Sequence, residues 1–301
     1  METLTECPVC NSKNNIPFIN CKDFTVSQKV FVIVECKDCG FKFTNPRPSE
    51  NEIGSYYQSE DYISHSNTKK GVINLLYQTV RKYTLKQKIN LINSLVNSKG
   101  NLLDVGCGTG EFLQACQENG WETLGIEPGE SARSYGINTY YLNIKEEPVL
   151  EKLGANSFEI ITLWHVLEHV PKLNERITEL KKLIKPNGSI IIAVPNCTSL
   201  DAEMYREYWA AYDVPRHLYH FTPITIEKLF AKHGLKLQKT LPMKFDSFYV
   251  SMLSEKYLQA DKQNKKGKTN LLPALWNGFQ SNLAAKKTNN SFSSQIYIFK
   301  K

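Results

Sequence analysis

The sequence predicts an α/β protein in which helices cover both faces of a parallel sheet, with a small metal-binding module in front. Three observations lead to this prediction. From residue 99 short apolar runs alternate with helical periodicity, as in folds where each helix returns the chain to a parallel sheet. A glycine-rich turn follows the first of these runs, and two Cys-x-x-Cys pairs lie before residue 45.

Composition limits the class of protein. The chain has 301 residues, 41% of them hydrophobic, and a net charge of +7. No apolar run approaches the roughly 18–20 residues that span a bilayer, and the N-terminus lacks a secretory signal pattern. We therefore expect a cytoplasmic protein whose eight cysteines are thiols or metal ligands rather than disulfides. The modest charge predicts mild attraction to anions but argues against a dedicated nucleic-acid binder.

The N-terminal module, residues 1–45, contains Cys7, Cys10, Cys36 and Cys39. Each Cys-x-x-Cys pair can bend into a knuckle that presents two thiolates to one ion, and two knuckles complete a tetrahedral site. Redox chemistry is the alternative for a single pair. A segment so poor in core residues needs the folding energy of a structural metal, roughly 10–16 kcal/mol for zinc. The arrangement resembles a zinc ribbon, which implies a closed structural Zn²⁺ site.

Residues 46–98 are expected to form a linker and a helical cap, because apolar side chains recur at helical spacing between 72 and 96. The tyrosines Tyr56, Tyr57 and Tyr62 precede this helix. They either lie over the ligand site of the main domain or pack the N-terminal module against it.

The segment from Leu102 to Phe112 predicts a buried strand, a tight turn and a helix. The glycines of the turn allow positive φ and close approach of a ligand, and the helix N-terminus suits an anionic group. The dinucleotide fingerprint G-x-G-x-x-G is not met, because the third glycine comes one residue early. Glu111 stands where that fingerprint needs glycine, and its carboxylate would repel a pyrophosphate.

The turn resembles the first motif of the class I S-adenosylmethionine-dependent methyltransferases, (D/E)-x-G-x-G-x-G. The matching residues are Asp104, Gly106, Gly108 and Gly110. The resemblance implies S-adenosyl-L-methionine as cofactor and a Rossmann-like, mostly parallel seven-stranded sheet whose last strand, expected at 295–299, is antiparallel. Glu127 lies 23 residues after Asp104 at the end of the next strand, where an acidic residue binds ribose hydroxyls. The family places Asn143, after a third strand expected at 140–142, near the adenine.

The fourth strand, 158–163, leads into Trp164-His-Val-Leu-Glu-His169. This segment resembles the "LEH" segment of small-molecule methyltransferases, including quinone-precursor O-methyltransferases. The resemblance places Trp164 and His165 against the sulfonium and adenine, with His165 also facing the acceptor. Glu168 and His169 either serve the site or are structural residues at the start of the next helix.

An insertion at 196–222 follows the fifth strand and is rich in aromatic and ionisable residues. Because open α/β sheets bind ligands beyond the carboxyl ends of their strands, we predict the acceptor pocket here. The predicted binding residues are Arg206, Tyr212, Asp213 and Arg216. His165, His217 and His220 are the candidate bases. The alternative is a rim held together by polar pairs.

A second insertion, 245–290, contains an apolar helical face. Its residues are Leu272, Leu275, Trp276, Phe279 and Leu283. We expect this face to pack on the core or on a partner in a homodimer. A lid over an apolar acceptor, or peripheral membrane contact through 271–287 and its lysines, are the alternatives.

The predicted function is in-line methyl transfer to a small-molecule or lipid-like acceptor by the domain at 99–301, with a histidine base. One alternative is a zinc-containing rRNA or tRNA methyltransferase. Against it, strand four ends in Leu-Trp-His rather than (D/N)-P-P-(Y/F), and residues 1–45 hold few lysines. The other is a non-catalytic cofactor-binding partner protein, against which the intact Asp104, glycines and Glu127 argue.

Overall fold

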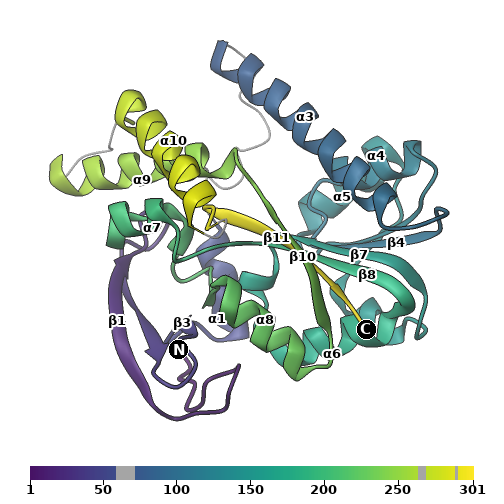
Figure 1. Ribbon diagram of the computed structural model, residues 1–301, viewed down its shortest axis with the longest axis horizontal. Coiled ribbons are helices and arrows are strands. Elements are labelled where there is room, and N and C mark those ends of the chain that lie inside the picture. Colours follow the sequence, from purple (N-terminus) through teal and green to yellow (C-terminus); the bar gives the residue numbers. More distant parts are fainter. Residues whose placement is uncertain (59–71, 264–268, 289–290) are drawn as a thin grey trace.

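The computed structural model describes residues 1–58, 72–263, 269–288 and 291–301 (Figure 1). A seven-stranded sheet with its helices lies beside a smaller N-terminal sheet, drawn in purple. In the described part of the chain, no helix has the length and apolar character needed to cross a membrane.

The large sheet has the strand order β10-β11-β8-β7-β4-β5-β6. Its strands are β4 (Asn101–Val105), β5 (Glu122–Ile126), β6 (Ile144–Lys145), β7 (Phe158–Trp164), β8 (Ile184–Pro195), β10 (Lys236–Pro242) and β11 (Ser294–Lys300). The pairs from β8 to β6 are parallel, whereas β11 runs antiparallel to both of its neighbours. The predicted mostly parallel sheet with an antiparallel last strand is confirmed.

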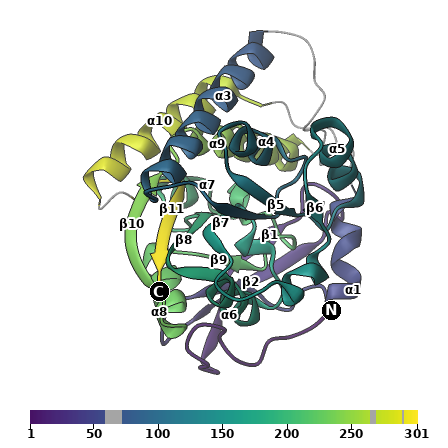
Figure 2. The same cartoon turned by 90° about the vertical axis from the view of Figure 1, so that its right-hand side faces the viewer.

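Helices cover both faces of this sheet, as the continuous apolar runs of its strands require (Figure 2). On one face lie α3 (Val72–Ser94), α4 (Glu111–Glu118) and α5 (Glu130–Tyr140); on the other lie α6 (Leu173–Leu183) and α8 (Pro223–Lys232). Successive strand residues point to opposite faces: Leu102 packs with Ile92 under α3, whereas Leu103 packs with Leu180 under α6.

The third strand lies later than predicted. α5 continues through Tyr140, and Tyr141 ends it with a left-handed φ of 56°. The strand β6 begins only at Ile144, which pairs with Gly125. The prediction of a strand at 140–142 was wrong. It relied on the β-propensity of the two tyrosines, but Tyr141 is 86% exposed beyond the end of the helix and packs against neither of the described sheets.

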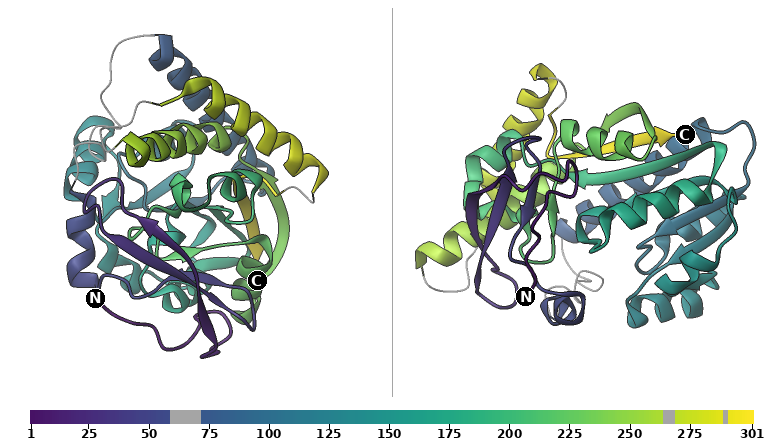
Figure 3. Two further views of the ribbon diagram at one scale, coloured as in Figure 1. Left: turned by 90° about the vertical axis from the view of Figure 1, so that its left-hand side faces the viewer. Right: turned by 90° about the horizontal axis from the view of Figure 1, so that it is seen from below.

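The N-terminal sheet, whose first strands are drawn in purple in Figure 3, includes a strand from far along the chain. Its antiparallel order is β1 (Asn15–Lys22), β2 (Val30–Cys36), β3 (Lys42–Thr44) and β9 (Tyr219–His220). β9 comes from the insertion at 196–222, so the predicted boundary at residue 45 does not enclose the whole sheet. One hydrophobic cluster runs from Phe41 and Phe43 of this sheet to Phe230 of α8.

Short elements complete the described chain. These are α1 (Glu50–Ile53), η1 (Gly54–Tyr57), η3 (Glu147–Lys152), η4 (Leu167–His169), α7 (Leu200–Tyr205), η5 (Arg206–Tyr208) and η6 (Ala210–Tyr212), followed by the longer helices α9 (Asp246–Gln263) and α10 (Leu271–Lys287).

The helix α10 packs through its small residues rather than its large ones. Ala274, Gly278 and Ser281 are buried, and a Cβ on Gly278 would lie 2.9 Å from the Phe248 ring of α9. The predicted apolar face points away from the chain: Leu272, Leu275, Trp276, Phe279 and Leu283 are all exposed, by 42–82%. Packing of this face on the core was therefore a wrong expectation. The homodimer, lid and membrane alternatives remain predictions.

Candidate functional site

The glycine turn lies between β4 and α4, and its three glycines serve different needs. Gly106, Gly108 and Gly110 have φ values of 72°, 56° and 88°, a region that L-residues adopt at a cost. A Cβ on Gly106 would lie 2.4 Å from Val166 Cγ2, and one on Gly110 would lie 2.5 Å from Leu142 Cδ1. A Cβ on Gly108 would meet no atom of the described residues within 4 Å. Packing therefore requires the outer glycines, and Gly108 is where a ligand can approach the backbone.

Two carboxylates border this turn. Asp104 is 3% exposed, and its Oδ1 accepts a 2.6 Å hydrogen bond from the Thr162 hydroxyl. Burial raises the pKa of Asp104 to about 7. Glu127 Oε2 accepts from the Gly108 N–H and Oε1 from the Gly129 N–H, both at 2.8 Å. The motif residues Asp104, Gly108 and Glu127 therefore lie at the ends of the adjacent strands β4 and β5, where Glu127 contacts the backbone of Gly108 directly.

Aromatic and cationic groups lie near Asp104. The Trp164 indole Nε1 is buried without a hydrogen-bond partner among the described residues, so it offers a donor to a ligand. Lys88 of α3 places Nζ 4.0 Å from the Trp164 ring centroid. Burial lowers the pKa of Lys88, although the negative charge of Asp104 acts in the opposite direction. Sequence analysis missed Lys88 because helical periodicity does not show which polar residue faces the sheet. Asn143 is exposed just before β6, and its carbonyl accepts from the Gly125 N–H.

His165 occupies a strained position at the end of β7. Its φ is 57°, and its N–H donates to the Ala193 carbonyl of β8 at 2.9 Å. Nε2 lies 3.0 Å from Asp246 Oδ2, and Nδ1 lies 3.4 Å from Glu168 Oε1. Burial opposes the charged ring, but the hydrogen bonds to the two carboxylates raise the pKa of His165 to about 10. In this state His165 is an imidazolium at neutral pH. Asp246 begins α9, a segment that sequence reasoning did not connect to the site.

The "LEH" segment and the 196–222 insertion meet at Glu168. Its carboxylate is fully buried, and its carbonyl accepts from the Leu218 N–H at 2.8 Å. The rings of His169 and His217 lie 4.6 Å apart between centroids, at 79°. Burial and the neighbouring His217 lower the pKa of His169 to about 4. His165 and His217, both predicted as candidate bases, therefore flank one buried carboxylate.

His220 lies toward the N-terminal sheet instead. It is 3% exposed, and its Nε2 lies 3.1 Å from the Thr44 hydroxyl. Burial and the nearby His217 hold the pKa of His220 well below its usual value. Its ring packs edge-on against Tyr212, whose pKa burial raises. Arg206 is exposed at the end of α7, away from these contacts.

Arg216 bridges the N-terminal module and the insertion. Its guanidinium is 1% exposed and pairs with Asp213 at 2.6 Å and Asp23 at 3.1 Å. It also donates to the Tyr56 carbonyl and the Thr25 hydroxyl. An acceptor would have to displace these groups to reach Arg216 or Asp213. In this structure the two residues hold the N-terminal module and the insertion together, and their role in acceptor binding remains a prediction.

Of the three tyrosines near the linker, Tyr56 packs edge-on against Phe31 of β2, as expected for packing the module against the domain. The Tyr57 hydroxyl reaches His169 Nδ1 at 2.9 Å. Tyr62 lies outside the described residues.

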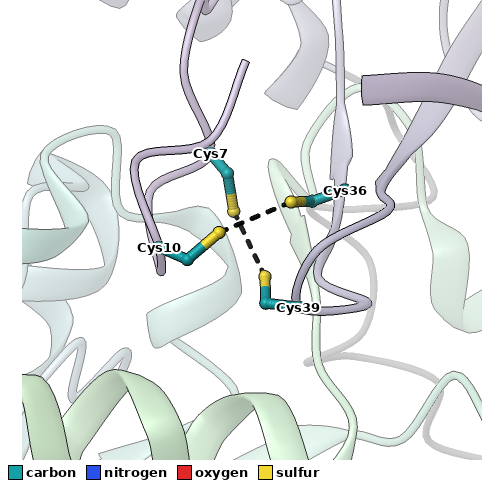
Figure 4. Close-up of side chains that lie close together, drawn as sticks. All are labelled: Cys7, Cys10, Cys36 and Cys39. Carbon is teal, nitrogen blue, oxygen red and sulfur yellow. Dashed lines mark hydrogen bonds between the residues drawn. The ribbon is translucent and has the colours of Figure 1, made fainter. Parts of the chain in front are cut away.

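The four cysteine sulfurs converge from two knuckles (Figure 4). Sγ atoms of Cys7 and Cys39 lie 3.5 Å apart, as do those of Cys10 and Cys36. A tetrahedral ion with Zn–S bonds of about 2.3 Å needs sulfurs about 3.8 Å apart. Backbone N–H groups of Val9 and Cys10 point to the Cys7 sulfur, as those of Asp38 and Cys39 do to Cys36. The donor set and spacing fit a closed zinc site.

Comparison with known proteins decides the family. A family model described as a methyltransferase domain matches residues 77–240, more than half of the chain. The chain belongs to this methyltransferase family. The matched range contains the glycine turn, Glu127, the His165–His169 segment and the 196–222 insertion, and it ends before α9 and α10.

Curated relatives match a shorter stretch. The ubiquinone biosynthesis O-methyltransferase of Pseudomonas fluorescens strain Pf0-1 is 30% identical over 118 residues, which is 36% of this chain and 50% of the relative. The same-named protein of strain SBW25 matches equally. The chain thus spans about half the length of the curated relatives it matches.

Solved structures support the fold of this methyltransferase. Magnesium protoporphyrin IX methyltransferase from Synechocystis PCC 6803, solved with bound SAH, superposes with a TM-score of 0.51 at 12% identity, covering 81% of this chain and 95% of that one. Geranyl diphosphate C-methyltransferase from Streptomyces coelicolor A3(2) gives 0.50 at 11% identity, covering 71% and 80%. At these identities the likeness shows the fold alone.

Proposed function

We propose that the protein transfers a methyl group from S-adenosyl-L-methionine to a hydroxyl oxygen of a small-molecule or lipid-like acceptor. One observation carries the proposal. Gly108 opens onto free space, where a Cβ would meet no atom of the described residues within 4 Å, beside the Glu127 carboxylate, and the cluster of His165, Glu168 and His217 lies beyond the same edge of the sheet. The O-methyltransferase relatives support oxygen as the accepting atom.

The residues around the turn divide the cofactor between them. Asp104 binds the ammonium of the methionine part, and Glu127 turns from the Gly108 N–H to the ribose hydroxyls. The bound cofactor supplies a sulfonium methyl for in-line displacement. The protein's main task is then to align the acceptor and exclude water, which the partly buried Trp164 and the cap helix α3 support.

The acceptor hydroxyl must also lose a proton. We assign this step to the His165–Glu168–His217 cluster. His165 is already protonated beside two carboxylates, so it suits an oxygen that gains negative charge. The Nδ1 of His217 lies 2.8 Å from the Ala211 carbonyl, which can only accept; Nδ1 therefore carries the hydrogen and Nε2 is left as the basic atom. His220, bonded to Thr44, lies farther into the N-terminal sheet.

The N-terminal cysteines complete the proposal. We propose that Cys7, Cys10, Cys36 and Cys39 hold a structural Zn²⁺ that fixes the sheet into which β9 inserts.

A cytoplasmic location is part of the same proposal. All eight cysteines are free of disulfides, as a reducing compartment requires.

The cofactor assignment is tested by calorimetric titration of S-adenosyl-L-methionine into wild type and three variants. Asp104→Asn and Glu127→Gln should each weaken binding by about ten-fold or more, since each removes a charge-assisted contact worth about 1.5–3 kcal/mol. Glu130→Gln is the matched control, because this exposed carboxylate begins α5 three residues after Glu127. Equal affinity in all four proteins would refute the assignment.

A further inference from the structure

Thr44 is the last residue of β3, and its side chain is fully buried where β3 meets the 196–222 insertion. Its hydroxyl donates to the His217 carbonyl at 2.8 Å and lies 3.1 Å from His220 Nε2. Its N–H donates to the Leu218 carbonyl at 3.0 Å. One residue of the N-terminal module therefore contacts three residues of the segment that carries two of the candidate bases.

The directions of these hydrogen bonds follow from the groups involved. A carbonyl can only accept, so the one hydrogen of the Thr44 hydroxyl points to His217. The hydroxyl oxygen must then accept from His220, whose Nε2 carries the hydrogen. Burial holds the pKa of His220 well below its usual value, so the ring is neutral and only one of its nitrogens carries a hydrogen. The contact with Thr44 therefore fixes one tautomer of His220.

The other contacts of His217 come from its own insertion. Its N–H donates to the Asp213 carbonyl at 3.0 Å, and its Nδ1 donates to the Ala211 carbonyl at 2.8 Å. These two bonds set the shape of the local turn, but they do not set its place beside the large sheet, because all three residues belong to one segment. The Thr44 hydroxyl reaches the same residue from a distant part of the chain and ties the turn to the N-terminal sheet.

The second cysteine knuckle determines where β3 begins. The Cys36 N–H donates to the Phe41 carbonyl at 2.9 Å, and the Gly40 N–H donates to the Cys36 carbonyl at 2.8 Å, so the chain passes from the knuckle directly into β3. This strand then pairs with β9, which carries His220. A metal ion held by the cysteines would therefore fix β3 and, with it, Thr44.

We propose that Thr44 is a positioning residue, which orients the ring of His220 and holds His217 beside the edge of the large sheet where we place the acceptor. The N-terminal module is then part of the acceptor site rather than a separate unit. The effect on methyl transfer rests on the proposed function, in which His217 Nε2 takes the acceptor proton. The orientation of the two histidines does not rest on it.

Histidine NMR tests the orientation. Full-length, zinc-loaded protein is labelled with ¹⁵N in its histidine rings, and long-range ¹H–¹⁵N spectra show which ring nitrogen carries the hydrogen. The variants His217→Gln and His220→Gln assign the signals. In the wild type, His220 should carry its hydrogen on Nε2 and His217 on Nδ1.

Three threonine variants isolate the hydroxyl of Thr44. Thr44→Val keeps the shape of the side chain but removes the hydroxyl, so it should give mixed tautomers of His220. Thr44→Ser keeps the hydroxyl and should show the wild-type pattern. Thr222→Val is the matched control, because Thr222 is also buried and its hydroxyl accepts from the Thr225 N–H; it should leave the signals of both histidines unchanged.

Label transfer tests the effect on the reaction. The proteins are given saturating S-adenosyl-L-methionine with a labelled methyl group and small-molecule and lipid extracts from cells lacking the protein. Because a general base contributes about 10²–10⁴-fold, Thr44→Val should slow transfer by about ten-fold or more while its calorimetric affinity for the cofactor stays at the wild-type value. Thr44→Ser and Thr222→Val should transfer label near the wild-type rate.

The outcomes are distinct. A wild-type His220 with its hydrogen on Nδ1, or an unchanged tautomer in Thr44→Val, would overturn the proposal. A changed tautomer with an unchanged rate would overturn the role in the reaction and leave the proposed function intact. Absence of transfer in the wild type would refute the proposed function, and the spectra would still decide whether Thr44 orients the ring. If Thr44→Val fails to fold, Thr44→Ala takes its place, and the wild-type tautomer decides in either case.

Discussion

Replacing Gly106 and Gly108 by alanine separates packing from ligand binding within a single turn. Both residues have positive φ, 72° and 56°, so each alanine costs about 1–2 kcal/mol in backbone strain. Their surroundings differ. The new Cβ at 106 would lie 2.4 Å and 3.0 Å from the two methyl groups of Val166, whereas the Cβ at 108 meets no atom within 4 Å.

The structure sets the size of the difference. Val166 is β-branched and cannot swing away easily, and overpacking of this kind costs about 1–3 kcal/mol. Gly106→Ala should therefore lower the free energy of unfolding by about 2–5 kcal/mol, and Gly108→Ala by only about 1–2 kcal/mol. The open space at Gly108 is where we place the cofactor, so Gly108→Ala should weaken its binding by about ten-fold or more, near 1.4 kcal/mol.

Urea unfolding without ligand measures the first effect, and calorimetric titration with S-adenosyl-L-methionine measures the second. The reasoning is refuted if the two variants lose equal stability, because the contact with Val166 would then be irrelevant. It is refuted equally if Gly108→Ala binds the cofactor as tightly as wild type does.

Two further predictions follow from buried charges. Arg216→Met should lower the free energy of unfolding by about 3–5 kcal/mol, because it leaves the buried Asp23 and the partly buried Asp213 without their cation. The exposed pair of Lys172 with Glu50 provides the control Lys172→Met, expected to cost under about 1 kcal/mol in urea unfolding. The pKa of Asp104 is raised to about 7 by burial, so cofactor affinity should rise with pH until about 7 and then level off in calorimetry. In the free protein the sign is opposite, since ionising Asp104 makes stability fall between its unfolded pKa near 3.9 and about 7. Asp104→Asn should abolish both dependences, and a pH-independent wild-type affinity would contradict the ammonium contact.

The local sequence predicts how the residues that we propose to bind the cofactor are placed, because these residues lie on consecutive elements. Asp104, the glycines and Glu127 occupy the ends of adjacent strands β4 and β5, so their spacing along the chain carries their geometry. The same logic predicted β11, whose apolar run needed a place in the sheet. It failed at β6, where only two residues pair and no periodicity can show them.

The acceptor half could not be predicted in the same way, since its contacts join distant segments. Asp246 reaches His165 across 81 residues, and Arg216 reaches Asp23 across 193. The guanidinium of Arg216 pairs with Asp23 and Asp213, and the sequence does not show that Asp23 lies close to it. The strand β9 likewise has no local signature, because it is a strand only through its pairing with β3. For α10 the sequence predicts the apolar helical face, but it does not show which face of the helix is buried. The small residues on the opposite face allow closer packing on α9.

Label transfer tests the central claim most directly. The full-length protein is incubated with S-adenosyl-L-methionine carrying a labelled methyl group, together with small-molecule and lipid extracts or with total RNA from cells lacking the protein. We predict label in a small organic or lipid product, loss of that label in Asp104→Asn and Glu127→Gln, and retention of it in Glu130→Gln. Label in RNA would contradict the proposed acceptor class, and tight cofactor binding without transfer to any fraction would contradict the proposed enzyme.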